Sequence, residues 1–227
     1  MAAVKGGDEV KDLLKSGASY EKMQMTSSPI FGPAIGGLSS KEHRQSSDCA
    51  KTFEDGLKAS SKPEELVLAF FVLKQIKKGS SSEETVYVSS LCFVIAGEEV
   101  SHLTGVKDKS KSEPYTLLRY AVGGASASVC LVAVTAEESR KDSVNAALDA
   151  VKSMRQVKNS APRSGNVKHF VDFTKNELPK QKAAAEKLND NPEKQKSAQK
   201  IVTRMEVMLK DAQELLSKPK ETKPKAY

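Results

Sequence analysis

The sequence contains no tryptophan, and aromatic residues make up only 5% of its 227 positions. Apolar residues make up 38%, below the roughly 45–50% of average globular domains, and most of them lie between positions 66 and 154. The charged fraction of 29% contains both signs, and the chain as a whole is too apolar to be disordered throughout. We therefore expect a folded core that does not extend to either end.

Cysteine is also scarce. Cys49, Cys92 and Cys130 are widely separated, and none has a second cysteine or a histidine close by. This pattern excludes a disulfide framework and a zinc-finger spacing, and it favours a reducing compartment. No apolar run reaches about 18 residues, and residues 1–8 lack the basic and apolar regions of a signal peptide. We expect a soluble intracellular protein that is not secreted and has no membrane partner.

Motifs of catalysis are missing as well. There is no Gly-x-Ser-x-Gly elbow, and His43, His102 and His169 are scattered without metal-binding spacing. The glycine-rich stretch 123–128 lacks the Lys-Ser/Thr of a phosphate loop and the third glycine of a dinucleotide fingerprint, so it favours close backbone packing instead. We expect no catalytic residues, no cofactor, no metal and no enzymatic activity.

The most informative absence is that of acidic residues between positions 150 and 171. The rest of the chain mixes both signs, yet this window holds five cations, which are Lys152, Arg155, Lys158, Arg163 and Lys168. Residues 151–227 contain 18 Lys and Arg against 9 Asp and Glu, whereas residues 1–150 contain 18 against 20. A basic stripe of this kind is typical of a surface that contacts phosphate.

The hydrophobic pattern predicts an all-α fold. Helix signals flank the apolar run in residues 62–78, with Pro63, Glu64 and Glu65 before it and Lys77, Lys78 and Gly79 after it. Ser81 and Glu84 have capping-box spacing and open a second apolar segment that ends at Gly105; its β-branched residues leave a strand possible. Further helices are predicted from 142 to about 155, from 167 to an interruption at Pro179, and from Asn191 to about 217.

Three regions follow from this pattern. Residues 1–40 are rich in Gly, Ser and Pro and are interpreted as a flexible arm. Residues 41–217 form a helical core domain with a basic groove near 152–168, and residues 218–227 form a basic disordered tail. The apolar residues of the arm and of a heptad-like seam over 198–215 are the candidates for self-association, namely Ile30, Phe31, Ile35, Ile201, Met205, Met208 and Leu215.

The leading functional hypothesis is a self-associating protein that binds single-stranded RNA, or another nucleic acid, without sequence preference. The five cations would contact phosphates, and Phe170, Phe173 or Tyr120 would offer a face on which a base stacks, although the two Phe positions are more typical of core. The layout is similar in organisation to small viral nucleocapsid or coat proteins, which would place the protein in the cytoplasm or in a virion. The alternative is a cytosolic helical adaptor that binds a partner protein through the 198–215 seam.

Overall fold

The chain folds into a mixed α/β structure, seen in a computed structural model that describes residues 1–60, 62, 64–78, 84–97, 100–134, 136–188 and 190–225. Helices account for 41% and strands for 22% of the residues, so the all-α prediction is wrong. The strands are β1 Ala2–Lys5, β2 Glu9–Asp12, β3 Glu21–Lys22, β4 Met25–Ser28, β5 Gly32–Ile35, β6 Leu66–Lys78 and β7 Glu84–Ala96. The helices are α1 Ser46–Lys58, α2 Val100–Lys107, η1 Tyr115–Leu118, η2 Glu138–Arg140, α3 Lys141–Met154, α4 Val167–Glu186 and α5 Pro192–Ser217.

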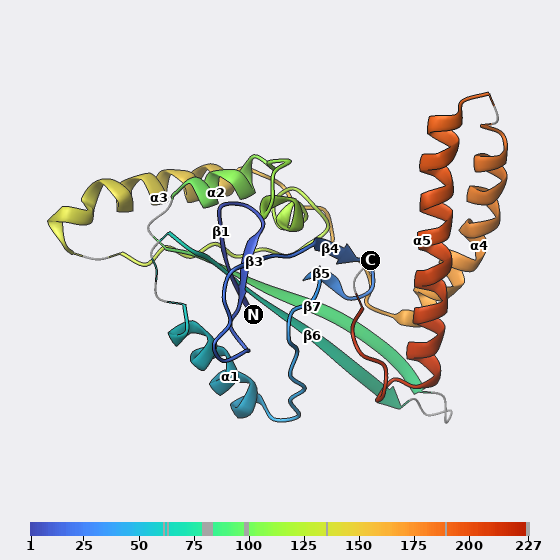
Figure 1. The fold of residues 1–227 in the computed structure, drawn as a ribbon, viewed down its shortest axis with the longest axis horizontal. Coiled ribbons are helices and arrows are strands. Elements are labelled where there is room, and N and C mark those ends of the chain that lie inside the picture. Colours follow the sequence, from blue (N-terminus) through green and yellow to red (C-terminus); the bar gives the residue numbers. More distant parts are fainter. Residues whose placement is uncertain are drawn as a thin grey trace.

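An antiparallel sheet with the order β3-β2-β1-β6-β7 forms the centre of the molecule (Figure 1). Its main unit is the long hairpin of β6 and β7, which pair residue by residue from Leu66 opposite Ala96 to Lys78 opposite Glu84. Strand β1 pairs with the other side of β6 through Ala2, Ala3 and Val4. Strands β4 and β5 form a separate two-stranded sheet.

The predicted helix over 62–78 is wrong, because residues 66–78 form strand β6. An apolar run of about eight residues is equally typical of a buried helix and of a strand covered on both faces. Here β1 and β7 pair with both sides of the run, and its first four residues are buried. The flanking signals at Pro63 and Gly79 lie outside the described residues.

The helix predicted from Ser81 to Gly105 is also wrong over most of its length. Residues 84–96 form β7, and only the short helix α2 follows. Val86 and Val88 are buried while Tyr87 between them is half-buried, which is the alternation of a strand and agrees with the β-branched content of this segment. Ser81 of the expected capping box lies outside the described residues.

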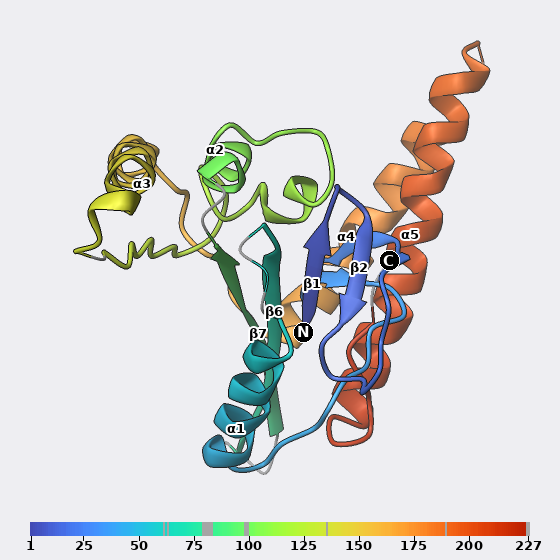
Figure 2. The same cartoon turned by 60° about the vertical axis from the view of Figure 1, so that its left-hand side comes forward.

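Helices and short segments cover both faces of the sheet (Figure 2). On one face, Phe53 and Leu57 of α1 pack against a cluster that contains Ala3 and Val67. On the other face, Val106 of α2 and Leu117 and Leu118 of η1 pack against a second cluster. The strand residues of this second cluster are Ala2, Val4, Val10, Ile35, Leu66 and Leu68. Residues 1–40 therefore supply β1–β5 and part of the core.

The two C-terminal helices pack on each other and stand beside the sheet, α5 and α4 being the red and orange helices of Figure 1. Val167 and Val171 of α4 and Ala212 and Leu215 of α5 form a third buried cluster with Phe31, Val86 and Val88. The predicted cap of the last helix is confirmed, since Asn191 accepts a hydrogen bond from the backbone N–H of Lys194. The predicted interruption at Pro179 is wrong, because α4 continues through it to Glu186.

An all-α core with two arms, on which the likeness to viral nucleocapsid and coat proteins rested, is thus not the architecture of this chain. The helical content is concentrated in the C-terminal part, while the described N-terminal part is built on strands. The acid-free window lies within the helical part, between α3 and α4.

Candidate functional site

The five cations of the acid-free window follow one another along the connection between α3 and α4, residues 152–168, here called the cation segment. Lys152 lies in the last turn of α3, Lys168 lies in the first turn of α4, and the three others lie on the irregular chain between them. All five side chains are exposed. None of the five pairs with an acidic side chain among the residues that the structure describes.

Asn159 anchors the middle of the cation segment. Its amide nitrogen donates to the carbonyl oxygens of Ala121 (3.0 Å) and Ser126 (2.9 Å) and to the hydroxyls of Ser126 and Ser128, and its amide oxygen accepts from the N–H of Gly123 (2.6 Å). The backbone N–H of Ser160 also donates to the oxygen of Gly124 at 2.9 Å. The glycine-rich stretch 123–128 is therefore the socket that holds this segment.

Gly124 and Gly123 are both required in that socket. A Cβ at Gly124 would lie 2.5 Å from the Cα of Tyr120, and Gly123 has a φ of +73°, which side-chain-bearing residues rarely adopt. Lys109 donates to the Gly123 oxygen at 3.2 Å and brings another cation to the same loop. The close packing expected of these small residues is thus observed.

The second anchor joins the cation segment to β7. The N–H of Val88 donates to the oxygen of Gly165 at 2.9 Å, and Tyr87 forms an antiparallel bridge with Asn166. A Cβ at Gly165 would lie 2.2 Å from the oxygen of Val88, so only glycine allows this approach. Asn166 then caps α4, because its side chain accepts from the N–H of His169 at 3.2 Å. Arg163 lies between the two anchors.

The aromatic candidates lie in different surroundings. Tyr120 is about half exposed, its ring lies 5.4 Å from the guanidinium of Arg119, and its own carbonyl accepts from Ser126 in the loop that Asn159 holds. Phe170 is half-buried against the cluster of Phe31 and Val86, whereas Phe173 is exposed on α4. Only Tyr120 of the three therefore combines an exposed ring with a place beside the first anchor.

The residues expected to drive self-association are divided between core and surface. Phe31 and Ile35 are buried, and Ile30 packs against the third cluster. Met208 and Leu215 are buried too, Met205 is half-buried and Ile201 is exposed. The C-terminal half of the 198–215 seam, with Met208 and Leu215, thus packs inside this chain. Its N-terminal half, with Ile201, is more exposed.

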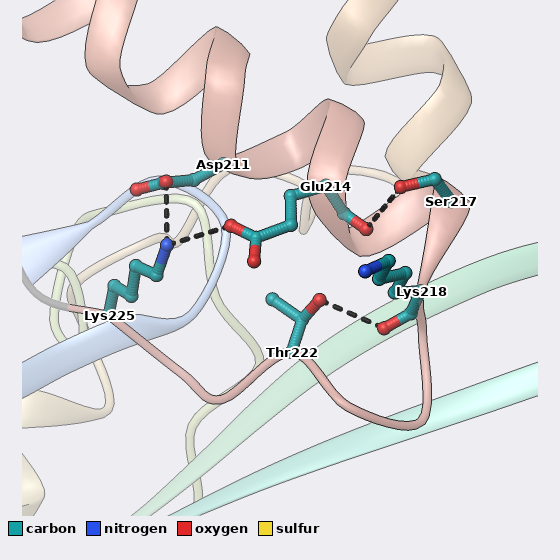
Figure 3. Close-up of polar contacts among 6 residues, drawn as sticks. All are labelled: Asp211, Glu214, Ser217, Lys218, Thr222 and Lys225. Carbon is teal, nitrogen blue, oxygen red and sulfur yellow. Dashed lines mark hydrogen bonds and ion pairs between the residues drawn. The ribbon is translucent and has the colours of Figure 1, made fainter.

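The basic tail folds back on α5 (Figure 3). Lys225 Nζ donates to Asp211 at 2.8 Å and to Glu214 at 3.0 Å, and these hydrogen bonds raise the pKa of the Lys225 ammonium. Lys74 of β6 donates to the carbonyl oxygen of Thr222 at 2.8 Å, and the Thr222 hydroxyl donates to the oxygen of Lys218 at 2.9 Å. Residues 218–225 are therefore held by both α5 and β6.

Groups capable of catalysis or metal binding are sparse in the described part of the chain. Burial raises the pKa of the Cys92 thiol to about 12, so this thiol is protonated at neutral pH. His102 contacts the Tyr115 hydroxyl at 3.0 Å and the Glu64 oxygen at 3.3 Å. Among the described residues, no group of three His, Cys, Asp or Glu side chains is placed to hold a metal. The described helices include none with the length and apolar character to cross a membrane.

Comparison with known proteins adds a fold likeness. No protein-family model matches the sequence, and no curated protein matches it. Among solved structures, the chain is similar to a kinesin motor domain, KIF14 residues 391–772, solved as a dimer in the two-heads-bound state with AMP-PNP in complex with a microtubule. The match has a TM-score of 0.55 and 18% identity, and it covers 72% of this chain and 59% of that chain. At this identity the likeness concerns the fold.

Proposed function

We propose that this chain binds single-stranded RNA along its phosphate backbone, without sequence preference, through the cation segment. The observation that carries the proposal is the row of five exposed cations with no acidic partner among the described residues. Each cation that meets a phosphate releases condensed counterions, which supplies most of the affinity in binding of this kind. Tyr120 supplies a stacking face beside the first anchor.

The two anchors support this proposal. A flexible basic loop would lose conformational entropy when it binds, whereas this connection is already fixed at Asn159 and at Gly165. Lys158 directly precedes the first anchor and Arg163 lies two residues before the second, so both exposed cations are close to fixed points of the backbone. Self-association remains part of the proposal, but Phe31, Ile35 and Leu215 are occupied in the core and are not its basis.

Salt-dependent binding of a labelled oligouridylate tests the proposal. If four of the five cations contact phosphates, the logarithm of affinity falls with the logarithm of salt with a slope of about −3, from about −0.7 per contact. In a variant in which Arg155, Lys158, Arg163 and Lys168 are each replaced by Gln, we expect this binding to be lost and the far-ultraviolet circular dichroism to be unchanged. The matched control replaces four other exposed cations, Lys15, Lys41, Arg44 and Lys51, and keeps the slope. Equal losses in the two variants, or no binding at low salt, would overturn the proposal.

The fold likeness favours a second polymer, the microtubule. The matched kinesin chain was solved on a microtubule, and its likeness to this chain extends over most of this chain's length. The sequence has no Gly-x-x-x-x-Gly-Lys-Ser/Thr phosphate loop, so the activity we propose here is nucleotide-independent binding. Cosedimentation with stabilised microtubules, with and without AMP-PNP, tests it. Sedimentation of this chain with microtubules but no binding of oligouridylate would replace the first proposal with the second.

A further inference from the structure

Residues 129–134, here called the apolar segment, form a run of six residues without a polar side chain, and all of them except the half-buried Val132 are exposed. Val129 is 86% and Leu131 is 88% exposed, and Val134 is exposed as well. No helix or strand includes these residues. A contiguous apolar surface of this kind is uncommon on a monomer and typically marks an interaction site.

The composition of the apolar segment is that of a β-strand. Its sequence, Val-Cys-Leu-Val-Ala-Val, is rich in β-branched residues and is too short for a helix of average length. The chain passes as an extended trace below α2 and α3 in Figure 1. In an extended chain Val129, Leu131 and Ala133 share one face, and all three are exposed.

Contacts at its beginning keep the apolar segment near α3. Ser128 receives a hydrogen bond from Asn159 at 3.1 Å and donates one to Ala121, and the thiol of Cys130 lies 3.8 Å from the sulfur of Met154. Helix η2 begins at Glu138, shortly after the segment. The segment is therefore held in an extended course while its outer face has no apolar cover.

The outer edge of β7 in the same chain is a surface to which an extended segment can add. Strand β7 ends the five-stranded sheet, and its outer edge is covered near Val88 by Gly165. Since strand backbone groups alternate in direction, Ser90, Cys92 and Val94 also direct their N–H and C=O groups away from β6. No described strand pairs with them there. Leu91 and Phe93 add exposed apolar side chains on the adjoining face.

We propose that two copies of the chain associate by strand addition, with residues 129–134 of one copy pairing along residues 89–94 of β7 in the other. This inference names the surface for the self-association proposed above. A second copy is the occupant because each chain carries both complementary parts, an apolar segment that belongs to no sheet and an outer edge of β7 with which no described strand pairs. The exchange is reciprocal, so the dimer closes with two-fold symmetry and leaves neither part exposed. Val129 and Leu131 then pack over Leu91 and Phe93.

The oligomeric state of the full chain tests this pairing. Sedimentation equilibrium is expected to show a dimer for the unchanged chain and a monomer for Leu131→Glu. The matched control is Leu148→Glu, because Leu148 is an exposed residue of α3 outside the proposed surface and should leave the dimer intact. A monomeric unchanged chain, or a Leu131→Glu variant that remains dimeric, overturns the inference.

A cross-link identifies the occupant even if Leu131→Glu fails to fold. In a chain with Cys49→Ser, Cys92→Ser and Ser90→Cys, oxidation is expected to join Cys130 of one copy to position 90 of the other, giving a non-reducing band at twice the 24.6 kDa mass. A cross-link within one chain, or none, overturns pairing between copies. Oligouridylate binding is measured on the same variants. An unchanged chain that is monomeric and binds RNA refutes the pairing and the self-association but not the proposed RNA binding, and a dimer without RNA binding refutes the RNA binding but not the pairing.

Discussion

Asn159 links the cation segment to the glycine-rich socket through four hydrogen bonds, and it donates a fifth to the carbonyl oxygen of Ala121. Asn159→Ala removes all five and leaves the N–H of Gly123 without its acceptor. We expect the free energy of unfolding to fall by about 1–2 kcal/mol, since the residue is exposed and water replaces part of the loss. The affinity for oligouridylate should fall as well, because the segment is no longer held in place. Urea denaturation and titration measure both, and Asn176→Ala on the exposed face of α4 is the control.

Gly165 occupies the other anchor, where a Cβ would lie 2.2 Å from the oxygen of Val88. Gly165→Ala therefore forces the cation segment away from β7 and breaks the hydrogen bond from Val88 to position 165. We expect a loss of about 1–3 kcal/mol in the free energy of unfolding. Gly36→Ala is the control, because a Cβ there has an ordinary contact of 3.5 Å with the oxygen of Gln24. Equal stability of both variants would contradict the anchor.

Asp12 is a buried carboxylate at the end of β2 that receives the backbone N–H groups of Ser39 at 2.7 Å and Leu14 at 2.9 Å. Burial alone would raise its pKa, but the hydrogen bonds from Ser39 and Leu14 outweigh burial and lower the pKa below 3.8. Its contribution to stability is thus complete above pH 3.8 and is lost as the pH falls through the lowered value. In Asp12→Asn this part of the acid dependence should disappear from chemical denaturation curves. The exposed Asp48→Asn should retain it.

Among the elements, helix α4 contains a proline in its interior and is still twenty residues long. Pro179 removes a backbone donor and costs about 3 kcal/mol in a helix interior. The helix nevertheless continues, because Val171 and Thr174 before Pro179 and Ala185 after it are buried. Pro179→Ala should therefore raise the free energy of unfolding by about 1–3 kcal/mol, measured in urea. No gain, or a loss, would indicate that α4 is broken at this position.

Sequence patterns predict the elements that are defined locally. Apolar spacing and the Asn191 cap identify α3 and α5, since a surface helix shows its period in its own residues. Strand β6 shows no such period, because β1 and β7 flank it and its first residues are buried. The capping signals around 62–78 are then misleading. Strands β1–β5 are short and separated by glycine and serine, a composition that also fits a flexible arm.

For the whole molecule, the sheet depends on contacts between distant parts of the sequence. Val4 lies opposite Leu66, and a single sequence carries no sign of that pairing. The cation segment can be predicted from the sequence, because an absence of acidic residues is a property of composition. Its anchors cannot be predicted from the sequence, because Asn159 and Gly165 have the sequence context of ordinary loop residues. Their roles follow only from their contacts with the socket and with β7.

We expect the C-terminal helix pair, α4 and α5, to unfold together with the sheet as one cooperative unit. Leu215 is 0% exposed and packs with Phe31, Val86 and Val88, whereas Ile201 of the same seam is 53% exposed. Leu215→Ala should lower the free energy of unfolding by about 2–5 kcal/mol, and Ile201→Ala should lower it by less than about 1 kcal/mol. Because the cluster joins α4, α5 and β7, hydrogen exchange in Leu215→Ala should accelerate together at Val88 and at Val171. Faster exchange confined to α4 and α5 would show that these two helices unfold independently of the sheet.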